Sequence, residues 1–106
     1  MRMLLKLTIP NGAGNRLAAA GKLGSTIKTL LEEIKPEAAY FIAEHGRRTG
    51  VLVVNLERAA DIPAIAEPLF LALEAEVEMH PCMLPEDLAQ AGPAIESAAR
   101  RYGQPR

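Results

Sequence analysis

The residues best suited to chemistry in this sequence lie in segments with strand-like alternation. His80 carries an imidazole whose unperturbed pKa lies near neutrality, so it could act as a general acid or base. Lys6 or Tyr40 could stabilise an enolate-like oxyanion on a bound substrate. We therefore take His80 as the candidate catalytic residue. The candidate ligand-binding residues are Lys6, Tyr40, Glu44, Asn55 and His80.

These residues share one surface if their strands alternate as expected, because successive side chains of a strand point to opposite faces. One face is expected to pack on helices, and it carries Leu5, Leu7, Phe41, Leu52, Val54, Leu56, Val77 and Met79. The opposite face then carries Lys6, Thr8, Tyr40, Glu44, Asn55, Glu78, His80 and Cys82. A few convergent polar groups in an apolar wall are typical of a small-molecule pocket. A shift of one residue would exchange Tyr40 and Glu44 for Phe41 and His45.

The same polar residues also have a purely structural interpretation. Lys6, Glu44 and Glu78 could form cross-strand ion pairs, with His80 merely hydrogen-bonded on that face. Paired charges are often structural rather than catalytic. Ligand binding and structural ion pairing therefore both remain open from the sequence.

Metal and cofactor sites are disfavoured by the spacing of the candidate ligands. Glu44 and His45 are adjacent on a predicted strand and point to opposite faces, so only one of them could join His80 in a metal site. The segment 12–17 has a leucine where a dinucleotide-binding motif needs its third glycine. Gly21 and Lys22 lack the flanking residues of a phosphate-binding loop. We expect no metal and no cofactor.

Hydrophobic periodicity predicts the elements that must position these residues. Strands are expected at Arg2–Ile9, Ala38–His45, Val51–Glu57 and Glu76–Cys82, and helices at Ser25–Ile34, capped by Ser25, and from Asp61, as a cap, to Leu73. A loop with one frayed helical turn is expected over 10–24, and a hairpin connection over 46–50. A last helix is expected to open at Pro85 and to be interrupted by Gly92 and Pro93. A frayed tail is expected after Tyr102. The order predicts an α+β fold, a ferredoxin-like βαββαβ unit with a four-stranded antiparallel sheet plus a C-terminal helix.

Length and composition set the remaining expectations. The 106 residues fit a single domain, 1–106, and a net charge of −1 is unsuited to nucleic acid. No apolar run approaches the ~20 residues of a membrane span. The single cysteine, Cys82, is compatible with a cytoplasmic protein. An aliphatic core without tryptophan and one bare sheet face favour a homodimer, arranged as a dimeric α+β barrel.

Four segments resemble short bacterial proteins of unknown function: 30–41, 61–68, 77–81 and 85–88. This resemblance implies no catalytic residues. More distantly, the order of elements is similar to the dimeric α+β barrel superfamily, which includes cofactor-independent monooxygenases, muconolactone isomerases and chlorite-dismutase-like haem proteins. The expected function is binding of a small organic molecule on the sheet face of a homodimer. The alternatives are a cofactor-independent isomerase or monooxygenase, with His80 as proton shuttle, and a structural or interaction module without a ligand.

Overall fold

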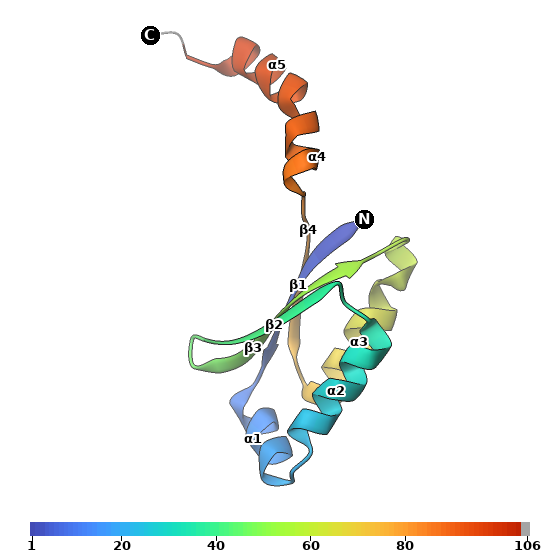
Figure 1. Ribbon diagram of the computed structural model, residues 1–106. Helices are drawn as coiled ribbons and strands as arrows, with labels where there is room; N and C mark the ends of the chain where they lie inside the picture. The colour runs from blue at the N-terminus through green and yellow to red at the C-terminus, as the bar shows by residue number, and fades with distance from the viewer. Residues whose placement is uncertain (105–106) are drawn as a thin grey trace.

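A four-stranded antiparallel sheet forms the body of the computed structural model, which describes residues 1–104 (Figure 1). The strands are β1 (Arg2–Ile9), β2 (Ala38–Glu44), β3 (Arg47–Asn55) and β4 (Glu76–Pro81), and they lie in the order β2-β3-β1-β4. The helices are α1 (Asn11–Ala19), α2 (Leu23–Ile34), α3 (Ile62–Leu73), α4 (Pro85–Gln90) and α5 (Gly92–Tyr102), with a 3₁₀ turn, η1 (Ala59–Asp61). The prediction of an α+β chain with a four-stranded antiparallel sheet is confirmed.

The hydrophobic core lies between the sheet and helices α2 and α3. Alternate residues of β1 are buried, and Leu5 pairs directly with Leu52 of β3 in the core. Leu30 of α2 and Leu69 of α3 pack against this layer. Because a one-residue slip would turn Lys6 into the core, burial of the alternate leucines fixes the register. The predicted division between a helix face and an open face holds for the residues that pair in the sheet, but β4 ends at Pro81, so Cys82 lies beyond the strand that was expected to contain it.

The connection between β2 and β3 is tighter than predicted. Only His45 and Gly46 form the turn, both with positive φ (52° and 74°), as a two-residue type I′ hairpin requires. Strand β2 therefore ends one residue before His45, and β3 runs from Arg47 to Asn55 rather than from Val51 to Glu57. The prediction of a connection over 46–50 is wrong, because ladder pairing continues to Glu44 opposite Arg47.

Helix α1 occupies a segment that the sequence predicts as a loop. Its two glycines lower helix propensity, but Ala13 and Gly14 are buried where the helix approaches β3. A Cβ atom on Gly14 would lie 2.6 Å from Nη1 of Arg48, so glycine permits this close approach. Arg48 also donates a hydrogen bond to Oδ1 of Asn15, at 3.0 Å. These tertiary contacts stabilise a helix that local sequence disfavours.

Neither predicted helix cap bonds to the first turn of its helix. Helix α2 begins two residues before Ser25, whose hydroxyl instead donates to the carbonyl of Lys22, at 3.2 Å. The Asp61 carboxylate accepts hydrogen bonds from the backbone N–H and the guanidinium of Arg58, at 3.3 and 2.8 Å. The hydrogen bond from Arg58 holds the pKa of Asp61 below its usual value. Asp61 thus stabilises η1 rather than α3.

The C-terminal arm, residues 84–102, projects beyond the end of the sheet (Figure 1). The last helix is in fact two, and Pro93 lies in the first turn of α5, where its missing N–H is harmless. The chain has a radius of gyration of 18.1 Å, where a compact chain of this length has about 13 Å. No residue from Pro85 to Tyr102 is buried. Of the tail predicted after Tyr102, residues 105–106 lie outside the described part.

Replacing Leu52 tests the position of the core. Leu52 is 0% exposed, so Leu52→Ala should lower the free energy of unfolding by ~2–5 kcal/mol, measured by urea denaturation. Leu71 offers a matched control because it is 81% exposed on α3, and Leu71→Ala should change stability by less than ~0.5 kcal/mol. Similar losses in both variants would contradict this placement of the core.

Candidate functional site

The open face of the sheet, opposite α2 and α3, carries three rows of paired side chains. Strand pairing, read from β2 to β4, gives the rows Ala38, Val53, Leu4 and His80, then Tyr40, Val51, Lys6 and Glu78, then Ile42, Thr49, Thr8 and Glu76. Side chains of β2 and β3 in these rows are mainly apolar, whereas those of β4 are polar. A ligand on this face would therefore meet an apolar half and a polar, acidic half.

Lys6 and Glu44 form an ion pair across this face. Lys6 belongs to β1 and Glu44 to β2, so the pair spans the intervening strand β3. Thr49 of β3 lies between them in the register and is only 2% exposed. Its hydroxyl donates to the carbonyl of Arg47, at 3.2 Å, so no polar atom of Thr49 is left unsatisfied beneath the pair. Of the cross-strand ion pairs that the structural interpretation predicts among Lys6, Glu44 and Glu78, the structure has Lys6–Glu44.

The ion pair shifts the titration of both partners. The hydrogen bond from Lys6 lowers the pKa of the Glu44 carboxyl below its ordinary value of 4.5. The same hydrogen bond raises the pKa of the Lys6 ammonium above 10.5. The pair's contribution to stability is therefore present between these two values. It is lost as the pH falls through the lowered pKa of Glu44 or rises through the raised pKa of Lys6.

Tyr40 and Asn55 lie on the open face but away from the ion pair. Tyr40 shares a row with Lys6 two strands away and is 67% exposed. Asn55 pairs with Arg2 at the end of β3, and its Oδ1 accepts a hydrogen bond from the N-terminal ammonium of Met1, at 3.1 Å. Asn55 therefore already has a partner within the chain, whereas the Tyr40 side chain is largely open to solvent.

His80 lies on the outer strand β4, beside Leu4 of β1. Its Nε2 is 3.8 Å from Oε2 of Glu78, which is too long for a hydrogen bond. Its side chain is 66% exposed, so solvent surrounds most of the imidazole in the single chain. The structure thus brings Lys6 and Glu44 together and leaves His80 separate from them. Acid–base chemistry at His80 would need a further surface to hold a substrate.

In the described part of the single chain, no helix or strand covers the open face of the sheet. A hollow of about 250 Å³ lies at the end of the face and is lined by Thr8, Pro10, Asn11, Arg47 and Glu76. None of the five candidate residues lines it. A pocket around Lys6 and Tyr40 would therefore need a wall supplied by another molecule.

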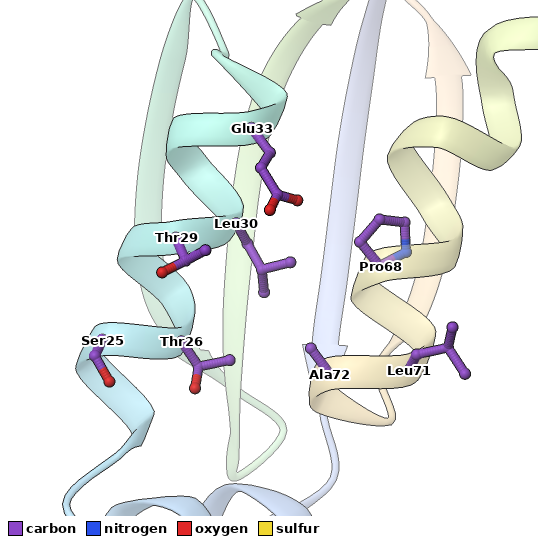
Figure 2. Close-up of a pocket in the computed structure, with 8 residues that line it drawn as sticks. All are labelled: Ser25, Thr26, Thr29, Leu30, Glu33, Pro68, Leu71 and Ala72. Carbon is purple, nitrogen blue, oxygen red and sulfur yellow. The ribbon is translucent and has the colours of Figure 1, made fainter.

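A groove between α2 and α3 was not identified from the sequence (Figure 2). It measures about 510 Å³, and Glu33 of α2 and Pro68 of α3 extend toward each other across it. Thr26, Thr29 and Glu33 recur at helical spacing, so a polar stripe beside Leu30 was the available signal. Glu33 is the only charged residue of the lining.

The described residues give no geometric support for metal binding. Within residues 1–104, no three His, Cys, Asp or Glu side chains are grouped to hold a metal ion. His45 lies in the hairpin turn, and His80 lies on the outer strand at the other edge of the sheet. Over the same residues, no helix has the length and apolar character needed to cross a bilayer.

Comparisons with known proteins do not extend this description: no protein-family model matches the chain, and no curated protein matches it significantly. Functional inference therefore depends on the geometry of the open face.

Removing Lys6 tests the electrostatics of the ion pair. In Lys6→Met the pKa of Glu44 should rise toward 4.5, because the donor that stabilises its charged form is gone. Carboxyl-carbon NMR titration of both proteins would measure this shift. Arg2→Met is a matched control, since Arg2 pairs with Glu37 and not with Glu44. An unchanged Glu44 titration in Lys6→Met would show that the pair does not persist in solution.

Proposed function

We propose that this protein is a homodimer that holds a small, partly polar organic molecule on the open face of its sheet. The observation that carries the proposal is the composition of this face: apolar residues of β2 and β3 surround one ion pair, Lys6–Glu44. A sheet face with exposed apolar side chains gains free energy when it is covered. One convergent polar group within an apolar wall is the pattern of a small-molecule site.

The proposed architecture is the ferredoxin-like sheet of a dimeric α+β barrel. The strand order β2-β3-β1-β4, with α2 and α3 on one face, supports this assignment. Helix α1 is an addition to the predicted βαββαβ order. In such a dimer the open faces of two copies oppose each other, and each supplies the wall that the other lacks. The unpaired Cys82 supports the cytosol as the proposed compartment.

The chemistry of the face limits the kind of ligand. An apolar body would lie against Val51 and Val53, which are half-buried in the single chain. A carbonyl or hydroxyl group would reach Lys6 and Glu44, which remain about one-third exposed, and the phenol of Tyr40. A strongly anionic ligand is disfavoured for two reasons. Glu44 already neutralises the charge of Lys6, and on the neighbouring strand β4 the side chains of Glu76 and Glu78 add negative charge. The proposed ligand class is a neutral, mainly apolar molecule with one or two oxygen functions.

Native mass spectrometry of freshly purified protein tests both parts of the proposal. We expect the mass of two chains together with a discrete additional mass. In Lys6→Met the dimer should persist while the additional mass is lost, because the ammonium that contacts the ligand is gone and the apolar half of the face is unchanged. A bare monomer in the wild-type protein would contradict the proposal.

A charge on the open face should separate the two copies. Val53→Asp places a carboxylate in the apolar half of the face, and it should shift the protein to monomer in light scattering at the same concentration. Leu71→Asp adds the same charge on α3 beside the groove, on the opposite side of the sheet, and should leave the dimer intact. Circular dichroism would verify that both variants are folded. Dissociation by Leu71→Asp alone would place the interface on the helices and contradict the proposal.

A second candidate function is a cofactor-independent isomerase or oxygenase of the same architecture. The open position of His80 favours it, because its imidazole is 66% exposed on the face that the second copy would cover and could exchange a proton with a substrate held there. Once native mass spectrometry identifies the bound molecule, His80→Ala should abolish its turnover while leaving its affinity unchanged. Unchanged turnover would remove His80 from any catalytic role.

A further inference from the structure

We propose that the C-terminal arm of one copy packs along strand β2 of a second copy, so that two arms are exchanged in the dimer. This inference rests on the proposed homodimer and adds the contact that would hold it together. The arm supplies an unpartnered apolar stripe, and β2 supplies an exposed apolar edge.

The apolar stripe of the arm has the spacing of a helix that packs against another surface. Its members are separated by four, three, four, three and four residues: Leu84, Leu88, Ala91, Ile95, Ala98 and Tyr102. Residues with this spacing lie on one side within each helix, and the stripe continues from α4 to α5 through Ala91, while Leu84 precedes the first turn of α4. Gln90 and Ser97 lie on the opposite side. Because Ile95 is 56% exposed and Tyr102 is 75% exposed, the stripe is uncovered in the single chain.

Strand β2 is an edge strand with three consecutive exposed side chains, Tyr40, Phe41 and Ile42. Exposed apolar edge strands promote association unless something covers them. A hollow of about 350 Å³ lies against this strand and is lined mainly by apolar residues, among them Ile27, Phe41 and Ile42. Side chains of the arm such as Ile95 have the size and apolar character to fill it.

The arm does not pack on β2 of its own chain, since it projects beyond the sheet and none of its residues is buried (Figure 1). It follows β4, which is the opposite edge strand and lies three strand spacings, or ~14 Å, from β2. It also leaves at the opposite end, because Pro81 pairs with Met3 whereas the hollow lies beside Ile9. The backbone N–H of Cys82 donates to the carbonyl of Arg2, at 3.2 Å, so the chain stays at the β1 side of the sheet until the arm begins. A second copy is therefore the natural acceptor.

Charge and length fit one orientation of the arm, antiparallel to β2. Its first turn carries Glu86 and Asp87, and its last turn carries Arg100 and Arg101. Arg47, the first residue of β3, lies beside one end of β2, and Glu37, which is paired with Arg2, precedes the other end. Two helices covering 85–102 span ~27 Å, and the seven residues of β2 span ~24 Å. The acidic first turn of the arm would thus meet Arg47 at one end of the contact.

The surface area of the chain agrees with a missing partner. The single chain exposes 7443 Å², whereas a folded monomer of its mass exposes about 5,800 Å². The excess is about the area that one subunit contributes to an obligate dimer interface. Exchange of two identical arms would bury such an area on each copy and would close with two-fold symmetry.

Engineered disulfides test the exchange in the full-length protein, with Cys82→Ser as the background. In Ile42→Cys/Ile95→Cys, oxidation should give a covalent dimer on a non-reducing gel, with the 42–95 linkage identified by peptide mass spectrometry. In Ile42→Cys/Ser97→Cys, where the second cysteine is on the polar side of α5, the yield should be several-fold lower. A 42–95 linkage within one chain would overturn the inference. If the wild-type protein is a dimer and no linkage forms, arm exchange is wrong but the proposed homodimer stands. If the wild-type protein is a monomer, both fail.

A charge test in solution is independent of cysteine geometry. Leu88→Glu/Ile95→Glu should raise the dimer dissociation constant by at least ~100-fold, because buried aliphatic side chains are replaced by charges. Gln90→Glu/Ser97→Glu adds the same charges on the opposite side of the arm and should leave it nearly unchanged. Equal effects in the two variants, each shown to be folded by circular dichroism, would overturn the inference.

Discussion

The pairing of β1 with β3 is the constraint on which the rest of the structure depends. Leu5 lies opposite Leu52, and both are completely buried beneath the helices. Because side chains alternate along a strand, this one match places Lys6 beside Val51 on the other face. The core and the candidate site are therefore two consequences of the same register. A change that weakened the leucine pairing would also move the residues of the open face.

Much of the sheet could be predicted from the sequence because alternation is a strong signal when one face is buried. It assigns Lys6, Tyr40 and Glu44 to the open face, where the structure has them. Helix α1 could not be predicted, because the contact that permits it joins Gly14 to Arg48, a residue 34 positions later in the chain. The hairpin length was missed because His45 adopts a positive φ that is unusual for a residue other than glycine.

The candidate site was only partly predictable for a related reason. Strand periodicity gives the face on which a residue lies but not its neighbours on that face. The Lys6–Glu44 contact reaches across β3 and therefore depends on the strand order. The separation of His80 from this pair follows from β4 being an outer strand. The groove between α2 and α3 depends on how two helices pack, which the polar stripe of α2 alone does not specify.

The two-residue turn at His45 and Gly46 has a consequence for the order of folding. It joins β2 and β3 directly, so this pairing closes a very short loop and costs little chain entropy. In contrast, β1 and β4 are separated by most of the chain, since Met3 pairs with Pro81. Pairing at this distance is slower, so we expect β4 to join the sheet last. The arm that follows β4 would then acquire a fixed position relative to the sheet only after the β2 edge has formed.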